Sequence, residues 1–164
     1  MHFTQKNFDR EKCILYFHGG GYVAGSPETH QNLLLSLANM SALQIFAIDY
    51  ALSPEKIFPQ AIDDAVNSYN ALLDKGFKNE NIFFGGDSAG GNLALVSTLK
   101  LQELNKKLPS KLFLLSPWTD LTGEGRSIKE NSKSDPYLSY DNWLNTSLSM
   151  QKTVKEWYAP NQDY

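Results

Sequence analysis

The stretch NIFFGGDSAGGNLALVSTLKLQEL, residues 81–104, decides the fold of this chain. Its first four residues form a short, mostly apolar run that is typical of a buried strand. Gly85 and Gly86 are expected to break that strand, and apolar residues at helical spacing predict a helix from about residue 88 to 104. The stretch therefore predicts a strand that turns through glycines directly into a helix.

The same alternation of strands and helices extends to both sides of this stretch. Short apolar runs predict four strands, at residues 13–17, 44–48, 81–84 and 112–115. Helical spacing predicts three helices, at residues 27–40, 62–73 and 88–104. Gly76 follows the second helix where a helix-ending glycine belongs. Nearly continuous apolar strands suit a parallel sheet with both faces covered, so we expect an α/β fold, a mainly parallel sheet flanked by helices.

The length and composition of the chain are those of one globular domain. It has 164 residues, of which 41% are hydrophobic and 20% charged. Residues 13–117 are expected to form the core strands and helices. Residues 118–164 are expected to form a polar excursion from the sheet and then a cap-like helical region at about 140–158.

Charge and cysteine content narrow the setting of the protein. A formal net charge of -3 leaves no basic footprint, which argues against nucleic acid as a partner. Cys13 is the only cysteine, so no disulfide can form within the chain, and we expect it to be a buried strand residue. Residues 1–12 lack the apolar centre of a signal peptide, and no apolar run reaches the ~18 residues that span a membrane. A cytoplasmic location is therefore expected.

The segment Gly86-Asp87-Ser88-Ala89-Gly90 matches the pattern G-x-S-x-G. The pattern by itself is weak, but here it lies between a predicted strand and a predicted helix, the setting that a nucleophilic serine in such an elbow requires. Small residues at Gly86 and Gly90 let the strand and the helix approach closely, which lifts Ser88 above the sheet. The alternative, a phosphate-binding glycine loop, needs a Lys-Ser/Thr pair after the glycines, and none follows.

Two segments are placed to stabilise the negative charge that attack by Ser88 creates. The N–H of Ala89 lies at a predicted helix N-terminus, where unpaired N–H groups and the helix dipole favour an anion. The run HGGG at residues 18–21 ends the first predicted strand, and its glycines can present further N–H groups without side-chain obstruction. We interpret His18 as a residue that shapes this loop, not as a catalytic base.

Four segments of the chain resemble signature blocks of one esterase family, the hormone-sensitive-lipase group. They are FHGGGYVAGS at 17–26, DYALSPE at 49–55, GGDSAGGN at 85–92 and SPWTDLT at 116–122. The blocks occur in the order of the family, and the resemblance extends from about residue 14 to 158. The usual Arg and Ala of the second block are Ala51 and Ser53 here. That block is structural in the family, so little follows for the chemistry.

The resemblance implies an α/β-hydrolase fold and the hydrolysis of small carboxylic esters, with no cofactor and no metal. By position, Ser88 is implied to be the nucleophile of an acyl-serine mechanism. The implied donors of oxyanion N–H groups are Gly20, Gly21 and Ala89. Gly19 is implied to shape the loop that carries the first two donors.

The acid and base of a catalytic triad are missing from the places where the resemblance implies them. In this fold the chain order is serine, then Asp or Glu, then His. The three histidines, His2, His18 and His30, all precede Ser88. We therefore expect the chain to be the central part of a longer enzyme, without its early and late strands. Exposed sheet edges would then favour self-association.

Other residues that draw attention have ordinary interpretations. Asp120 and Asp135 are interpreted as loop carboxylates or, for Asp120, as a helix cap. His30 is interpreted as an exposed polar residue on the first helix. Core packing is the expected role of three large residues near the end of the sequence, Trp143, Leu144 and Trp157.

Three functions stay open at this point. The first is a carboxylesterase that acts through an acyl-serine intermediate, which the ordered blocks support. The second is a catalytically inactive fragment or remnant of such an esterase, because a serine without an adjacent base is a weak nucleophile. The third is a binding or scaffold protein that reuses the fold, since a fold does not determine a function.

Overall fold

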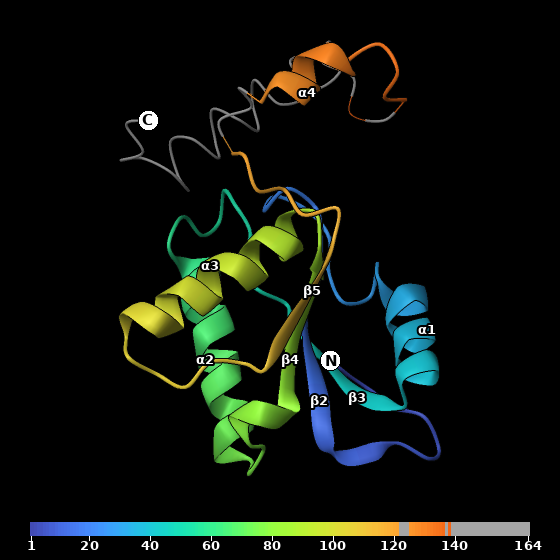
Figure 1. Cartoon of the computed structure of the whole chain (residues 1–164), viewed down its shortest axis with the longest axis vertical. Helices are drawn as coiled ribbons and strands as arrows, with labels where there is room; N and C mark the ends of the chain where they lie inside the picture. The colour runs from blue at the N-terminus through green and yellow to red at the C-terminus, as the bar shows by residue number, and fades with distance from the viewer. Residues whose placement is uncertain (122–124, 137, 139–164) are drawn as a thin grey trace.

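A computed structural model of the chain describes residues 1–121, 125–136 and 138. An open sheet lies between two layers of helices (Figure 1). Helix α1 (Gln31–Ser41) covers one face of the sheet, and helices α2 (Gln60–Asp74) and α3 (Ala89–Glu103) cover the other. The expected α/β fold is therefore confirmed.

The strands of the described residues form one sheet in the order β1-β3-β2-β4-β5. Their bounds are β1 His2–Phe3, β2 Asp9–Phe17, β3 Leu43–Ala47, β4 Ile82–Asp87 and β5 Lys111–Leu115. β1 pairs antiparallel with β3, and the other neighbouring pairs are parallel, as expected of a mainly parallel sheet. Self-association through the outer strands stays a prediction.

The apolar run in β2 supplies both faces of the sheet. Successive side chains of a strand point to opposite faces. Cys13, Leu15 and Phe17 join the core beneath α2 and α3, whereas Ile14 and Tyr16 join the smaller core beneath α1. All five are buried, which explains why this run lacks the alternation of a half-exposed strand. Cys13 is buried as expected, and burial raises the pKa of its thiol to about 12.

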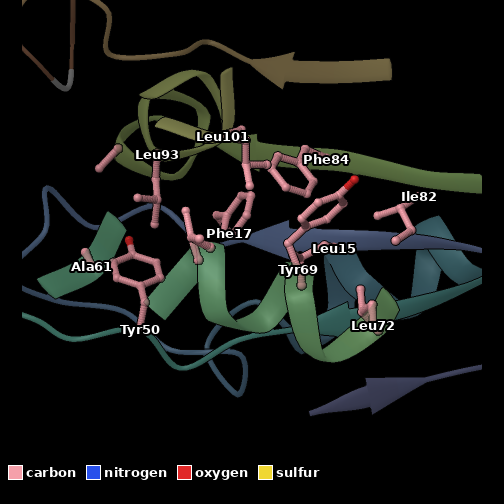
Figure 2. Packing of buried hydrophobic residues seen from close by; sticks show 14 of the residues in the cluster. Leu15, Phe17, Tyr50, Ala61, Tyr69, Leu72, Ile82, Phe84, Leu93 and Leu101 are labelled. Carbon is pink, nitrogen blue, oxygen red and sulfur yellow. The ribbon is translucent and has the colours of Figure 1, made fainter. Parts of the chain in front are cut away.

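Aromatic side chains fill the centre of the larger core (Figure 2). The ring of Phe84 on β4 meets Phe17 on β2 edge-to-face, with centroids 5.2 Å apart, and meets Tyr69 on α2 in the same way at 5.4 Å. The Tyr69 hydroxyl donates a hydrogen bond to the Lys107 carbonyl at 2.9 Å, so its polar end is satisfied. Edge-to-face pairs add ~0.5–1.5 kcal/mol to the burial of such rings, and they lock α2 onto the two central strands.

The helices follow the predicted apolar spacing. The buried residues of α2 are Ala61, Ala65, Val66, Tyr69 and Leu72. Leu34 and Ala38 are the buried residues of α1, and Leu33 and Leu37 pack against the same core. Gly76 follows α2 with φ +97°, the left-handed conformation that a helix-ending glycine adopts.

The parallel pairing of β2 with β4 positions the candidate site. In this register Phe17 lies opposite Gly86, so the carboxyl ends of the two strands reach the same edge of the sheet. The HGGG loop leaves the sheet after Phe17, and Ser88 follows the last residue of β4. Segments about 70 residues apart in the sequence are thereby brought side by side.

The prediction that Gly85 and Gly86 break the third predicted strand was wrong. β4 continues to Asp87 because both glycines pair on each side, Gly85 with Tyr16 and Phe113. A Cβ on Gly85 would overlap the ring of Phe113, so the glycine makes room for an aromatic side chain inside the sheet.

The N-terminal boundaries also differ from those predicted. The first predicted strand begins at Asp9, not at residue 13, and β1 was not predicted. The amide of Gln44 donates to the carbonyls of Asp9 and Arg10, which keeps this polar segment in the sheet. The first helix begins at Gln31, not at residue 27, because Thr29 Oγ1 donates to the Ser26 carbonyl at 2.8 Å and holds a separate turn.

The region after β5 is described only in part. It contains a short helix, α4 (Arg126–Glu130), and the excursion expected of residues 118–164 stays a prediction. The helical region predicted at about 140–158 lies outside the described residues, as do Trp143, Leu144 and Trp157. Within the part of the chain that the structure describes, no helix has the length and apolarity needed to cross a membrane.

Candidate active site

The turn at Ser88 joins β4 to α3 in a strained conformation. Ser88 has φ +50° and ψ −119°, values that a non-glycine residue rarely adopts. Its N–H donates to the Leu115 carbonyl at 3.0 Å, and its carbonyl accepts from the N–H of Trp118 at 2.9 Å and of Asn92 at 3.1 Å. The backbone around the serine is therefore held both by its own helix and by the turn that follows β5.

Two glycines allow this turn to pack closely, as the G-x-S-x-G pattern predicts. A Cβ on Gly90 would overlap the carbonyl oxygen of Phe17, and a Cβ on Gly86 would overlap the backbone of Gly90. The first turn of α3 thus lies directly against the ends of β2 and β4. Because glycine has no side chain, the first turn of α3 can approach the ends of these strands closely enough to place Ser88 beside the HGGG loop.

The HGGG loop turns back on itself next to the serine. Gly20 has φ +124° and Gly21 φ +64°, and the Gly20 carbonyl accepts from the N–H groups of Val23 at 3.1 Å and Ala24 at 3.0 Å. Among the described residues, no hydrogen bond to a protein atom uses the N–H of Gly20, Gly21 or Ala89. These three N–H groups are the ones that the sequence predicts for an oxyanion hole.

Asp87, the residue before the serine, bridges the elbow and the loop. Its Oδ1 accepts hydrogen bonds from the Tyr16 hydroxyl at 2.9 Å and from the Gly19 N–H at 3.0 Å. Its Oδ2 lies 3.3 Å from Nε2 of His30. Burial and the adjacent carboxylate raise the pKa of Tyr16 well above its ordinary value of 10, so the phenol stays protonated and donates. The sequence placed Asp87 in the elbow but gave it no partner.

His18 lies beneath the loop, away from solvent. Its Nδ1 is 2.7 Å from the Gly19 carbonyl, and its ring stacks on Tyr50 with centroids 4.3 Å apart. The Tyr50 hydroxyl in turn donates to the His18 carbonyl at 2.6 Å. Burial lowers the pKa of His18 below the ordinary value of 6.5, which favours the neutral ring. These contacts fit a residue that shapes the loop.

Tyr22 provides another anchor for the loop. It has φ +64°, is buried, and its hydroxyl donates to Oδ1 of Asn92 on α3 at 2.6 Å. No role for Tyr22, Tyr50 or Asn92 is predicted from the sequence, although each lies in one of the quoted blocks. A polar or phenolic side chain inside an otherwise small-residue block was the signal that could have found them.

The interpretation of His30 as an exposed residue on the first helix was wrong. His30 immediately precedes α1, its side chain is only 20% exposed, and it faces Asp87. The turn at residues 26–29 redirects the chain, so that the ring points toward the elbow instead of solvent. Asp120 accepts from the N–H of Gly125, the residue before α4, at 2.9 Å, and Asp135 accepts from the Leu138 N–H at 2.7 Å, so each carboxylate bonds to nearby backbone.

The described histidines are all engaged with groups other than the serine. His2 stacks on Phe46 with ring centroids 4.4 Å apart, His18 contacts Gly19, and His30 contacts Asp87. Within residues 1–121, 125–136 and 138, no hydrogen bond joins the Ser88 hydroxyl to a histidine, and no three His, Cys, Asp or Glu side chains are grouped to hold a metal ion.

Comparison with known proteins gives consistent matches. The family model described as alpha/beta hydrolase fold matches residues 14–163. The chain is 41% identical over 130 residues to an esterase of Acinetobacter venetianus, covering 79% of this chain and 43% of that protein. It is 38% identical over 116 residues to an acetyl-hydrolase of Streptomyces hygroscopicus, covering 71% of this chain and 39% of that protein.

A solved structure agrees with the sequence matches. The crystal structure of an esterase from the bacterial hormone-sensitive lipase family superimposes with a TM-score of 0.90 at 32% identity. The superposition covers 98% of this chain and 53% of that one. The chain thus spans about half the length of the relatives that it matches.

Proposed function

The chain belongs to the α/β-hydrolase-fold family, and from that premise we propose that it carries the nucleophile and the oxyanion hole of a carboxylic-ester hydrolase. Ser88 is the nucleophile, and the N–H groups of Gly20, Gly21 and Ala89 form the oxyanion hole. The observation that carries the proposal is the convergence of the strained serine turn and the HGGG loop at one edge of the sheet.

The reaction proceeds through an acyl-serine. Ser88 Oγ attacks the ester carbonyl carbon and forms a new C–O bond, while the carbonyl oxygen takes up the negative charge. The intermediate collapses, its bond to the alcohol oxygen breaks, and the alcohol leaves with a proton. Water then attacks the acyl-serine in the same way and releases the carboxylic acid. Each step needs a base to take the proton of the attacking hydroxyl or water.

The oxyanion hole accounts for the glycine loop. The negative oxygen of the intermediate accepts hydrogen bonds best from donors that are already aimed at it. Ala89 offers the first N–H of α3, where the helix dipole adds to the attraction. Gly20 and Gly21 offer further N–H groups from the HGGG loop. The loss of one such donor typically lowers turnover by about 10²–10³.

A catalytically inactive form of the same scaffold is the second candidate. It is favoured by the observation that the three histidines all contact groups other than Ser88. An oxyanion hole and a serine without a base leave only residual catalysis. The two candidates share the fold and differ in whether Ser88 can be activated.

Hydrolysis of a short-chain chromogenic ester by the purified chain separates the two candidates. A serine-directed fluorophosphonate, followed by peptide mapping, reports on the nucleophile directly. We expect both signals in the wild type and in Ser36→Ala, an exposed serine on α1 that serves as the matched control, and neither in Ser88→Ala. Hydrolysis unchanged by Ser88→Ala refutes the assigned nucleophile. No hydrolysis and no labelling in the folded wild-type chain supports the inactive form.

A further inference from the structure

We propose that Asp87 and His30 together position the oxyanion loop, with His30 acting as an imidazolium that donates from both ring nitrogens. This inference rests on the proposed function, because it assigns the contacts around Asp87 a purpose in that site. Tyr16, Gly19 and His30 surround the Asp87 carboxylate, and we call this group the Asp87 clamp.

The Asp87 clamp joins three residues between positions 16 and 30 to a carboxylate that lies 57 to 71 positions later in the sequence. Tyr16 comes from β2, Gly19 from the oxyanion loop and His30 from the residue before α1, whereas Asp87 is the last residue of β4. Asp87 is the neighbour of Ser88, so a bond from its Oδ1 to the Gly19 N–H fixes the loop relative to the nucleophile. The donors proposed for the oxyanion, Gly20 and Gly21, follow directly.

Acceptors face both ring nitrogens of His30. Nδ1 lies 3.2 Å from the Ser26 carbonyl and 3.0 Å from Thr29 Oγ1. The Thr29 hydroxyl already donates its only proton to the Ser26 carbonyl, so Nδ1 has to be the donor to both. Nε2 faces Oδ2 of Asp87, which is a carboxylate acceptor. Only a ring with a proton on each nitrogen makes all of these bonds, and it places a positive charge beside the carboxylate.

His18 has the opposite environment. Its Nδ1 faces the Gly19 carbonyl, whereas its Nε2 is buried and has no hydrogen-bond partner among the described residues. One acceptor suits a neutral ring with its proton on Nδ1. The ring centroids of His18 and His30 are 5.6 Å apart, so a neutral His18 leaves the positive charge to His30 without repulsion.

Because the contacts of His30 require a proton on each ring nitrogen, the Asp87 clamp depends on the charge of that ring. Asp87 on β4 contacts the His30 ring, Tyr16 on β2 donates to Asp87, and the ring centroid of His18 lies 5.6 Å from that of His30. Asp49 after β3 and Glu28 in the preceding turn interact electrostatically with His18. Asp87 is the one carboxylate among them in contact with the ring. When His30 loses a proton, one of its donors is lost, so the loop is held most tightly when the ring is charged.

A pair of amide substitutions at His30 tests the Asp87 clamp in the full chain. His30→Gln places its amide nitrogen near the position of Nε2 and can still donate to Asp87. His30→Asn reaches only the position of Nδ1 and cannot. We expect the amide of Gly19 to exchange hydrogen about tenfold faster in His30→Asn than in the wild type, and His30→Gln to restore most of the protection. Asp63→Asn, an exposed carboxylate on α2, is the control.

A measurement on the unmodified protein accompanies the variants in case they fail to fold. The ¹⁵N resonances of the His30 ring and the exchange of the Gly19 amide, corrected for its intrinsic pH dependence, are followed between about pH 5 and 8, where histidine charge changes. We expect the loss of the ring proton and the loss of Gly19 protection to share one midpoint. We expect no such step in His30→Gln.

Two results overturn the proposal. One is equal exchange of the Gly19 amide hydrogen in His30→Gln, His30→Asn and the wild type. The other is a titration of the His30 ring that leaves Gly19 protection unchanged. Neither measurement depends on turnover. If the His30 titration and the Gly19 protection share one midpoint but Ser88 is not labelled by the fluorophosphonate, the proposed hydrolase is refuted and the Asp87 clamp stands. If Ser88 is labelled but Gly19 protection does not follow the His30 titration, only the Asp87 clamp is refuted.

Discussion

The serine turn and the oxyanion loop meet at one edge of the sheet but are held in place by different means. The turn depends on main-chain contacts, to the carbonyl of Leu115, the N–H of Trp118 and the carbonyl of Phe17. The loop depends on side chains from other elements, Asp87, Tyr50 and Asn92. One half of the site is thus fixed by backbone sterics and the other by distant polar groups, and the two should respond differently to substitution.

The largest effect is expected where the turn has no space. Gly90→Ala places a Cβ against the carbonyl oxygen of Phe17, and neither backbone can move without separating α3 from β2. We expect a loss of about 3 kcal/mol in the free energy of unfolding, at the upper end for overpacking. Urea denaturation followed by circular dichroism measures it.

Gly76→Ala is the matched control for this substitution. Unlike Gly90, it lies at positive φ, and nothing lies within 4 Å of its added Cβ. Only backbone strain of ~1–2 kcal/mol is then expected. Equal losses in the two variants would mean that contact with Phe17 does not fix the serine turn.

A smaller and more selective effect is expected in the loop. Tyr50→Phe keeps the ring against His18 but removes the donor to the His18 carbonyl, and a buried unpaired carbonyl costs ~1–3 kcal/mol. Tyr69→Phe removes an equivalent bond to the Lys107 carbonyl far from the site. Both variants should lose stability, but only Tyr50→Phe should accelerate amide exchange at residues 19–21. If the two variants exchange alike there, Tyr50 has no special part in holding the loop.

The smallest effect is expected from the titration of His18. Its folded-state pKa is lowered by burial, so below the ordinary value of 6.5 the unfolded chain binds a proton more readily than the folded one. This contribution to stability is present above pH 6.5 and is lost as the pH falls toward the folded-state pKa. His18→Asn should reduce the slope of unfolding free energy against pH. A slope identical to that of the wild type would show that His18 does not titrate on unfolding.

The comparison also explains what the sequence could predict. The serine turn was predicted because its requirements are local: an apolar strand, small residues at Gly86 and Gly90, and a helix immediately afterwards. The strands at 13–17 and 112–115 were found for the same reason. The end of β4 was predicted too early, at Gly85. The backbone of Gly85 is held by strands on both sides, and a rule based on local sequence contains no information about neighbouring strands.

The side chains that hold the loop were not predictable from local pattern. The contact between His30 and Asp87 spans 57 positions and that between Tyr16 and Asp87 spans 71, so each depends on the register of β2 against β4. β1 was missed because two residues carry no periodicity, and they become a strand only through pairing with β3. The features that were not predicted, β1 and the contacts of Asp87, are those that depend on residues far apart in the sequence.

The register of β2 against β4 has a consequence for the order in which the molecule is built. The HGGG loop is synthesised about 70 residues before Ser88, and in a growing chain it lacks its contacts to Asp87 and Asn92 until β4 and α3 dock. Contacts this distant along the chain form slowly, because a long loop must first be closed. The oxyanion loop therefore matures with the sheet and not before it. The time at which the Gly19 amide becomes protected from hydrogen exchange during refolding would therefore report when β4 pairs with β2.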